Sequence, residues 1–379
     1  EIRRRNFVER GDTLPIGQEL ETAVELPALV EAVGERVGEL PEPSGPRQAV
    51  GRGYACNLQS YGRCIWLNDW SSAWVGFELD GTLVIRIAVP DIGCGQASSL
   101  IQIASEVLGV PPQRITIHIG DSALNPLTGT TTATRQLYMS GNAVLKAATE
   151  LRDALADVAA GLLEVDAEQV EFSPDGVSAN GAGVSFERLL ATAASVDVPW
   201  HVLTTYHAPK GIPWKADESW RGRVLPDFTY GCHAVDVEVD LDTGQVRVLR
   251  YVAGHDVGRA INPVSVEGQI EGAVAMGLGY ALSERLVFEE AQNLSTTFSQ
   301  YLIPTAAELP AIESVVLESG EGMGPFNARG IGEPPIGPPA PAVAAAIEDA
   351  CGVAMSTLPF TPERVAAAID AGGGDDGEG

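Results

Sequence analysis

A single glutamate stands in a turn of glycine and proline that could hold it rigidly, which is what a catalytic base requires. The stretch 328–337 reads ARGIGEPPIG and precedes an alanine-rich segment that favours a helix. Gly330 and Gly332 carry no side chain that would keep a bulky ligand from the backbone, and two prolines restrict the chain just after the acid. Glu333 is therefore our candidate general base. The alternative is an ordinary surface glutamate in a loop.

Two other turns contain groups that suit an anionic ligand. Gly93 and Gly95 flank Cys94 at the start of an expected helix, where backbone N–H groups can receive a phosphate or another negatively charged oxygen. The run 128–134 reads TGTTTAT, and its hydroxyl and backbone donors could surround a phosphate without any cation. Each turn also has an interpretation without a ligand, the first as a plain helix start and the second as a solvated threonine turn.

The cysteines and histidines predict no metal site. The five cysteines are scattered, without a C-x-x-C pair, which indicates reduced thiols, a cytoplasmic protein, and neither a Cys-ligated iron–sulfur cluster nor a structural zinc. His118 and His233 fall within expected strands and His255 precedes a turn, so we interpret all three as packing or hydrogen-bonding groups. His201 and His207 have no partner spacing typical of a metal site.

Composition excludes some partners. The chain has 379 residues, of which 45% are hydrophobic, enough for one large domain or two intimate ones. Its 24 lysines and arginines are outnumbered by 51 acidic residues, and the formal net charge of −27 repels nucleic acid and anionic membranes. No apolar run approaches the ~18 residues of a membrane span, and the first residues lack the apolar core of a secretory signal. Because position 1 is not Met, we expect that the numbering begins inside a longer gene product or after processing.

The pattern of the chain predicts an α+β fold, with mixed sheets and packed helices that position these turns. The elements expected in the first half are a hairpin of strands 73–79 and 83–89 joined at Asp80-Gly81-Thr82, a helix over 98–108, a strand over 114–120 and a long helix over 140–164. The stretch 166–226 is a less regular excursion, with a short strand near Val170 and a helix over 185–194.

The second half is more regular. Strands over 233–239 and 245–251, alternating in period two around a D-T-G turn, predict a hairpin with one buried face. The elements expected after it are helices over 265–285, 340–350 and 361–369 and strands near Val315. We divide the chain into a lead-in over 1–45 with an amphipathic helix over 19–39 and a linker, a main domain over 46–370 that could form two intimate lobes, and a disordered acidic tail over 371–379.

Three separated turns resemble, in order and content, those of the molybdenum hydroxylases of the xanthine dehydrogenase and aldehyde oxidase family. Residues 254–263 (GHDVGRAINP) and 266–272 (VEGQIEG) are similar to the family's D-x-G-x-x-I-N-P and V-E-G-Q-I-x-G sequences. The turn around Glu333 resembles its G-x-G-E-P-P signature, and residues 91–95 (DIGCG) with 102–105 (QIAS) resemble an earlier glycine-rich turn and helix. The match spans most of the chain and corresponds to the C-terminal half of the family's molybdopterin-binding subunit.

The resemblance assigns roles to individual residues. It implies that residues 46–370 form a molybdopterin-binding domain, and that the amide of Gln269, at the expected start of a helix, contacts the cofactor as donor and acceptor. Asp256 and Asn262 look structural, bonding the turns around that helix start. No side chain is implied as a direct metal ligand. Cofactor contacts are implied for Gly93, Cys94, Gly95, Thr131, Ala133, Thr134 and Gln269.

The activity implied is that of an oxidoreductase. Such an enzyme uses water to hydroxylate an electron-poor carbon of an N-heterocycle, purine-like or nicotinate-like, or of an aldehyde. Glu333 would be its general base, ionised yet poorly solvated and without a permanent Arg or Lys partner. The cofactor implied is molybdopterin carrying molybdenum, alone or in its cytosine dinucleotide form. A 2Fe-2S subunit and an FAD subunit are implied as partners that accept the electrons.

The sequence departs from the family pattern in two places. Cys94 stands where many members carry a glutamine between the two glycines. The N-terminal half of the molybdenum subunit has no counterpart here, as in nicotinate dehydrogenase-type enzymes that split this subunit into two polypeptides; truncation of a longer product is the alternative. A second hypothesis for function is a non-catalytic scaffold subunit that binds no metal, hinted at by Cys94. A hydrolase is set aside because no G-x-S-x-G sequence occurs.

Overall fold

Strand β9 (Asp227–Asp240) is the centre of the larger part of the molecule. The computed structural model describes residues 2–64, 69–209 and 222–372. In it β9 lies between β1 (Gln48–Tyr61) and β10 (Val246–Asp256) and is antiparallel to both. Strand β13 (Ile312–Leu317) pairs in parallel with β10, so these residues form a mixed sheet of order β1-β9-β10-β13.

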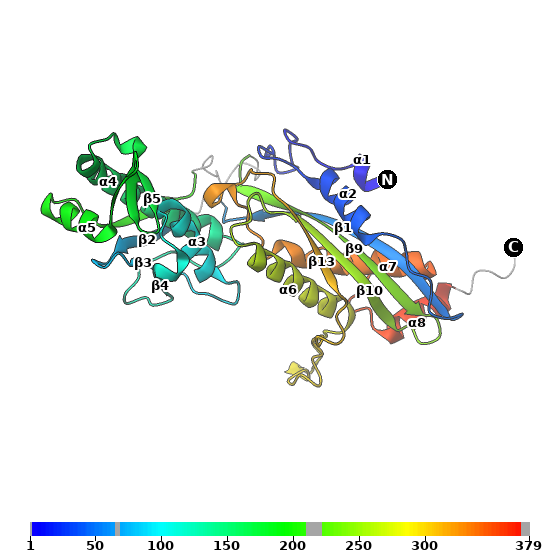
Figure 1. The fold of residues 1–379 in the computed structure, drawn as a ribbon. Helices are drawn as coiled ribbons and strands as arrows, with labels where there is room; N and C mark the ends of the chain where they lie inside the picture. Colours follow the sequence, from blue (N-terminus) through cyan, green and yellow to red (C-terminus); the bar gives the residue numbers. More distant parts are fainter. Residues whose placement is uncertain (1, 65–68, 210–221, 373–379) are drawn as a thin grey trace.

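The prediction that this hairpin has one buried face is wrong. Every residue of β9 except Asp240 is buried. The reason is that helices cover both faces of the sheet: α2 (Leu26–Val37) packs on one, and α6 (Pro263–Leu282) with α7 (Pro339–Cys351) packs on the other (Figure 1). The period-two alternation of polar residues therefore marks buried polar groups rather than a solvated face.

Helix α7 approaches β1 so closely that two strand positions must be glycine. A Cβ at Gly51 would lie 2.3 Å from the carbonyl oxygen of Ala346, and one at Gly53 would lie 1.9 Å from that of Ala342. Both distances are far below van der Waals contact, so any larger residue would push the helix off the sheet. Helix α8 (Pro362–Gly372) extends the same layer, with Val365 in its core.

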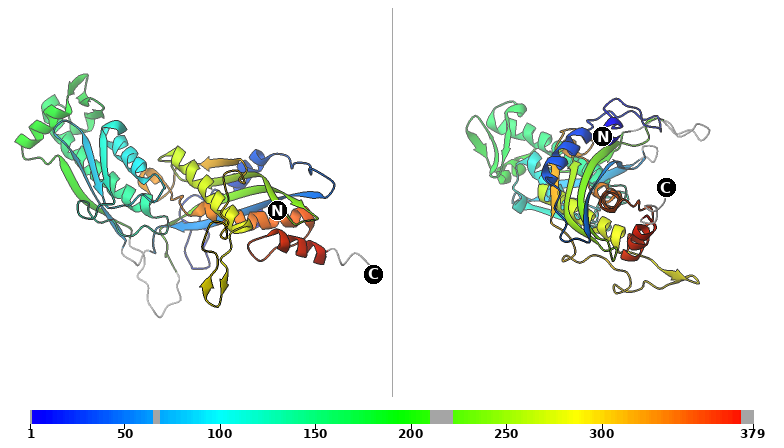
Figure 2. Two further views of the ribbon diagram at one scale, coloured as in Figure 1. Left: turned by 90° about the horizontal axis from the view of Figure 1, so that it is seen from below. Right: turned by 90° about the vertical axis from the view of Figure 1, so that its right-hand side faces the viewer.

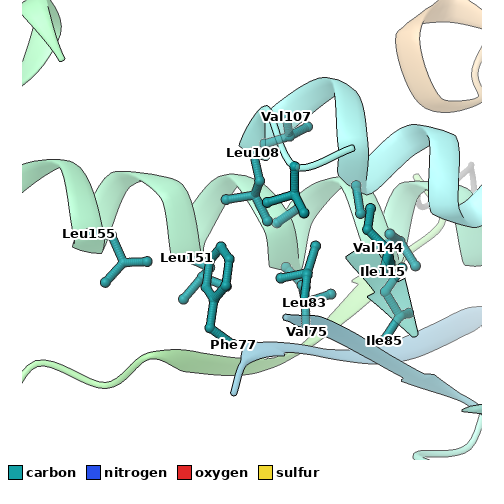
Figure 3. Packing of buried hydrophobic residues seen from close by; sticks show 14 of the residues in the cluster. Val75, Phe77, Leu83, Ile85, Val107, Leu108, Ile115, Val144, Leu151 and Leu155 are labelled. Carbon is teal, nitrogen blue, oxygen red and sulfur yellow. The ribbon is translucent and has the colours of Figure 1, made fainter. Parts of the chain in front are cut away.

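The remaining lobe is inserted between β1 and β9. Its described residues form a sheet of order β4-β3-β2-β8, in which β2 (Trp70–Phe77) pairs antiparallel with β3 and β8. Helices α3, α4 and α5 bury their apolar faces on it. Figure 3 shows Leu151 and Leu155 of α4 over Phe77 and its neighbours. The other elements of this lobe are β3 (Leu83–Ile87), α3 (Gln96–Leu108), β4 (Ile115–Ile119), a π-helical turn (Leu137–Gly141), α4 (Asn142–Leu163), β5 (Glu171–Ser173), β6 (Gly176–Ala179), β7 (Ala182–Val184), α5 (Phe186–Ser195) and β8 (His201–His207).

The two lobes lie side by side along the long axis of the molecule (Figure 1). From the larger lobe an arm projects after α6, with the short hairpin β11 (Phe288–Glu289) and β12 (Gln292–Asn293) at its tip, drawn in yellow in Figure 2. The predicted α+β class with mixed sheets and packed helices is confirmed. The predicted hairpins and the helices after residue 95 are also confirmed, with ends shifted by a few residues.

The helix predicted over 19–39 is shorter than expected. It begins at Leu26, because Pro27 fits only the first turn of a helix, and it follows a four-residue helix α1 (Ile2–Arg5) and an irregular stretch. Of the predicted tail 371–379, the first two residues end α8, and residues 373–379 lie outside the described part of the chain.

Candidate functional site

Loops at the junction of the two lobes enclose an open cavity of about 450 Å³. Five segments form its walls: the turn before α3 with the start of that helix, the threonine-rich loop, the loop 257–262, one side of α6 and the stretch 329–333. Among the described residues that line it, Glu333 is the one carboxylate, whereas Arg135, Arg259 and Arg329 are cations. Each of these arginines is paired with an acidic residue, Arg135 with Asp69, Arg329 with Asp256 and Arg259 with Glu106.

Glu333 is held in this cavity by Thr134. The Thr134 hydroxyl donates to Glu333 Oε2 at 2.7 Å and accepts from the Glu333 backbone N–H at 3.2 Å. None of the ion pairs formed within residues 2–64, 69–209 and 222–372 involves Glu333, as expected for a base. The expected low solvation is not provided by this chain, since Glu333 is exposed in it.

Gly330 and Gly332 have different tasks, which corrects the interpretation that both make room for a ligand. A Cβ at Gly330 would lie 2.6 Å from the Thr134 carbonyl oxygen, so this glycine lets the two walls touch. A Cβ at Gly332 would make ordinary contacts, 3.8 Å from Thr134 Cγ2 and 3.9 Å from Gln269 Oε1. Only Gly332 therefore keeps open space beside the acid.

A buried arginine fixes the glutamate turn from behind. Arg329 pairs with Asp256 at 2.7 Å and donates to the backbone carbonyls of Glu321 at 2.7 Å and Ala23 at 2.8 Å. Asp256 also accepts from the backbone of Gly258 at 3.0 Å, in agreement with its predicted structural role. The turn that carries Glu333 is thus tied to the end of β10 and to the N-terminal segment.

A second buried arginine fixes the threonine-rich loop. Arg135 forms a two-pronged ion pair with Asp69 at 2.7 and 2.8 Å, and its Nη1 donates to the carbonyls of Thr128 and Thr130. Thr131 and Thr134 line the cavity, and the Thr131 hydroxyl accepts a short hydrogen bond from Gln136. Ala133 lies outside the lining; its carbonyl accepts from Gly62 at 2.7 Å.

The glycine turn before α3 is organised by an acid within it. The backbone N–H groups of Gly93 and Gly95 donate to Asp91 Oδ1 at 3.0 and 3.2 Å, so they are not free to receive a ligand as the sequence suggested. Burial raises the pKa of Asp91, but hydrogen bonds from the backbone of Gly93, Ala97, Gly95 and Gln96 outweigh it, and the pKa is lowered overall. Gly93 and Cys94 line the cavity, whereas Gly95 does not. Burial and the nearby Asp91 raise the pKa of the Cys94 thiol.

Two amides face the cavity from the two helices. Gln269 lies in the second turn of α6 rather than at its start, because Asn262 caps that helix by accepting from Ser265 N at 3.2 Å. Gln96, which sequence reasoning missed, is buried at the first position of α3, and its Nε2 has no hydrogen-bond partner among the described residues. An amide directly after the G-C-G turn was the available signal for Gln96. Arg259, also missed, lines the cavity and pairs at 3.2 Å with Glu106 in an exposed ion pair.

The cavity thus offers three donors: the unpartnered amide of the buried Gln96, the half-buried amide of Gln269 and the exposed guanidinium of Arg259. Such donors fit a ligand rich in phosphate and other oxygen acceptors. Within the described residues, no group of three His, Cys, Asp or Glu side chains converges to hold a metal ion directly. Across the same residues, every helix is too short or too polar to cross a membrane.

Known proteins are similar to this chain in sequence and in fold. The family described as "Molybdopterin cofactor-binding domain" matches residues 31–310. The xanthine dehydrogenase molybdenum-binding subunit of Escherichia coli is 29% identical over 379 residues, covering 96% of this chain and 48% of that protein. The nicotine 6-hydroxylase large subunit of Paenarthrobacter nicotinovorans is 31% identical over 394 residues, covering 96% of this chain and 46% of that protein.

Among solved structures, the aldehyde oxidoreductase of Desulfovibrio desulfuricans has a similar fold, with a TM-score of 0.78 and 28% identity. The similarity covers 97% of this chain and 38% of that one. The chain therefore spans less than half the length of the relatives it matches.

Proposed function

This chain belongs to the molybdopterin cofactor-binding domain family of the molybdenum hydroxylases, and from that membership we propose that its cavity is one wall of a molybdenum-cofactor site in an oxidoreductase. The observation that carries the proposal is that three predicted site residues converge on one cavity. Glu333, Thr134 and Gln269 lie far apart in the sequence, yet they line one cavity, and Glu333 bonds directly to Thr134.

The donors of the cavity would hold molybdopterin. Gln96 and Gln269 offer amides, and Arg259 offers a charge for a phosphate. When bound, the cofactor supplies the two-electron redox chemistry of the reaction. Gly95 and Ala133 would act only by shaping the neighbouring backbone. The predicted contacts that line the cavity, and that we propose touch the cofactor, are Gly93, Cys94, Thr131, Thr134 and Gln269.

Glu333 would take a proton from the oxygen that attacks the substrate carbon. The Thr134 hydroxyl fixes the carboxylate so that its other oxygen, Oε1, can accept this proton. Such a base must be shielded from water, and the exposure of Glu333 in this chain implies that another polypeptide segment closes the cavity. We propose an electron-poor carbon of an N-heterocycle or an aldehyde as the site of hydroxylation, supported by the reactions after which the relatives are named.

An exposed apolar surface supports the proposed partner. Helix α6 has no charged residue after Glu271, and Val264, Met276 and Tyr280 on its outer side are 78%, 61% and 58% exposed. Met276 also lines the cavity. The arm after α6 exposes Phe288 and Phe298 as well. Because exposed apolar side chains gathered on one surface mark interaction sites, we propose that the missing half of the cofactor subunit covers this side of α6, and that 2Fe-2S and FAD subunits complete a cytoplasmic assembly.

Metal content and one substitution test the function. In the purified native complex we expect about one molybdenum per chain by mass spectrometry, and nucleotide analysis of the extracted cofactor identifies its form. Glu333→Gln should retain molybdenum but lower kcat by about 100-fold or more, because the base is lost. Glu271→Gln, an exposed α6 glutamate outside the lining, is the control. A complex without molybdenum would support the scaffold hypothesis, and near-normal turnover in Glu333→Gln would contradict the assigned base.

A further inference from the structure

A row of buried polar side chains lies on the α6 and α7 face of the larger sheet, beneath the Glu333 turn. The Tyr251 hydroxyl is 2.8 Å from His233 Nδ1, and His233 Nε2 is 2.8 Å from His255 Nε2. All three residues are fully buried. Asn57, on the neighbouring strand β1, donates from Nδ2 to the carbonyl oxygen of Pro334 at 2.8 Å. Pro334 is the residue directly after Glu333.

The row has one gap, which is bounded by two unpartnered atoms. His255 Nδ1 and Asn57 Oδ1 are buried and have no hydrogen-bond partner among the described residues. Both face Gly231, where an added Cβ would lie 2.4 Å from Asn57 Oδ1 and 2.7 Å from His255 Nδ1. Glycine at 231 therefore lets both side chains pack against its backbone, which places their unpartnered atoms near each other. Buried polar atoms are normally satisfied, so His255 and Asn57 are natural partners of one another.

The proton positions in this row follow from its two ends. The Pro334 carbonyl can only accept, so Asn57 must present Nδ2 to it and Oδ1 to His255. At the other end, His233 is the one hydrogen-bond partner of the Tyr251 hydroxyl among the described residues, so the Tyr251 proton must go to His233 Nδ1. His233 then carries its proton on Nε2 and donates to His255 Nε2, which leaves the proton of His255 on Nδ1, facing the gap and Asn57.

The reverse arrangement is disfavoured. With His255 donating from Nε2 and His233 donating from Nδ1, the Tyr251 proton has no acceptor in the described part of the chain. An unsatisfied buried hydroxyl costs free energy, whereas the first direction gives the Tyr251 proton an acceptor. Burial and the nearby His255 lower the pKa of His233, and burial lowers that of His255 to about 3, so both rings are neutral near pH 7.

The geometry points to a one-way hydrogen-bond chain that runs from Tyr251 through His233 and His255 towards Asn57 and the Pro334 carbonyl. It makes Asn57 a positioning residue for Glu333, because Asn57 holds the peptide that follows the acid. The proton arrangement stands independently of the proposed function, whereas the positioning role rests on it.

Nitrogen NMR of histidine-labelled full chain tests the proton arrangement. Of the five histidines, His118, His201 and His207 are exposed and serve as internal references for averaged tautomers. We expect two further histidines that remain neutral from pH 8 to pH 5, one protonated on Nε2 and one on Nδ1. Tyr251→Phe should change the nitrogen shift of the Nε2–H ring and thereby assign it to His233. Two rings with the same tautomer, or either ring charged at pH 7, would overturn the chain.

Asn57→Leu in the active complex tests the positioning role. We expect kcat to fall about tenfold, because a displaced general base transfers protons poorly, while KM and molybdenum content stay unchanged. The pH profile of kcat should also move, whereas a variant that merely folded less completely would keep the shape of the profile. An unchanged kcat and profile would refute the role of Asn57. A wild-type complex without molybdenum would instead refute the proposed function and leave the NMR result intact.

Discussion

The threonine-rich loop and the Glu333 turn face each other across the cavity, and each is anchored by a fully buried arginine. The partners of these arginines differ. Arg135 binds carbonyls of its own loop and one distant segment, through Asp69 and the Trp70 carbonyl. Arg329 binds the carbonyl of Glu321 nearby in the chain and two distant segments, through Asp256 and Ala23. The threonine wall is therefore tied to one distant segment of its own lobe, and the Glu333 wall to two distant segments of the larger lobe.

Because their anchors differ, the two walls should respond differently to mutation. The Glu333 wall rests on the N-terminal segment, on the end of β10 and on the histidine row beneath it. The threonine wall rests on the segment that holds Asp69 and Trp70. Thr134 joins the two walls through its hydrogen bonds to Glu333, and Gly330 allows that contact.

Removing either buried arginine should have the largest effect on stability. Arg329→Met leaves the buried Asp256 without a cation, and Arg135→Met leaves Asp69 with only Arg63 at 3.9 Å; we expect each to lower the free energy of unfolding by about 3–5 kcal/mol. Arg329→Met should lie at the upper end, because Asp256 is fully buried and three segments lose their tie. Urea unfolding measures both. Arg259→Met, which loses an exposed ion pair and a cation–π contact over the Phe326 ring at 4.8 Å, should cost about 1 kcal/mol or less. Equal losses in all three variants would show that the anchors are not special.

The pH dependence of stability should come from the two buried histidines beneath the Glu333 turn. The pKa values of His233 and His255 lie below 6.5 in the folded chain, so the unfolded chain binds more protons as the pH falls through 6.5. The stabilisation is complete above pH 6.5 and is lost towards about pH 3. Between pH 6.5 and 5.5 the free energy of unfolding should fall by about 2 kcal/mol for the pair, and His255→Gln should remove about half of that dependence. His118→Gln, an exposed control, should leave it unchanged, and an unaltered slope in His255→Gln would exclude this source.

Cutting the link between the walls should have a moderate effect on catalysis. Thr134→Val removes a hydrogen bond to a charged carboxylate, which is typically a difference of about 1.5 kcal/mol, so kcat should fall roughly tenfold with little change in molybdenum content. Steady-state kinetics of the complex measure this effect. Thr192→Val, which removes a hydroxyl on α5 bonded to the Arg188 carbonyl, is the matched control. A normal kcat in Thr134→Val would mean that the walls act separately.

The third wall of the cavity, the glycine turn over residues 91–95, should be the least sensitive to substitution. The Cys94 thiol reaches only Asp91 and Gln96, each at 3.8 Å, and the turn is held by the backbone bonds to Asp91 instead. Cys94→Ser should therefore change the free energy of unfolding by less than about 0.5 kcal/mol. A loss above 1 kcal/mol by thermal or urea unfolding would show that the thiol, and not Asp91, organises the turn.

Local patterns explain which parts of the site could be foreseen. The turn around Glu333 and the hairpin at Gly81 depend on short runs of glycine, proline and alternating apolar residues, so the sequence alone indicates them. Gln269 was placed near a helix start, whereas the Asn262 cap moves it one turn further in. The backbone donors of the 91–95 turn were expected to be free, but Asp91 occupies them. A side chain bonding its own turn leaves little trace in composition.

The sequence by itself determined the α+β class and the family, because these follow from short-range pattern and motif, and it predicted Glu333 as the base from the turn in which it stands. Only the tertiary structure decided that β9 is buried on both faces, that Arg135 and Arg329 anchor the two walls, and that His233 and His255 form one row with Asn57. These contacts join residues tens to hundreds of positions apart. Burial and partner choice there are set by which helices cover the sheet, and no local run of residues encodes that.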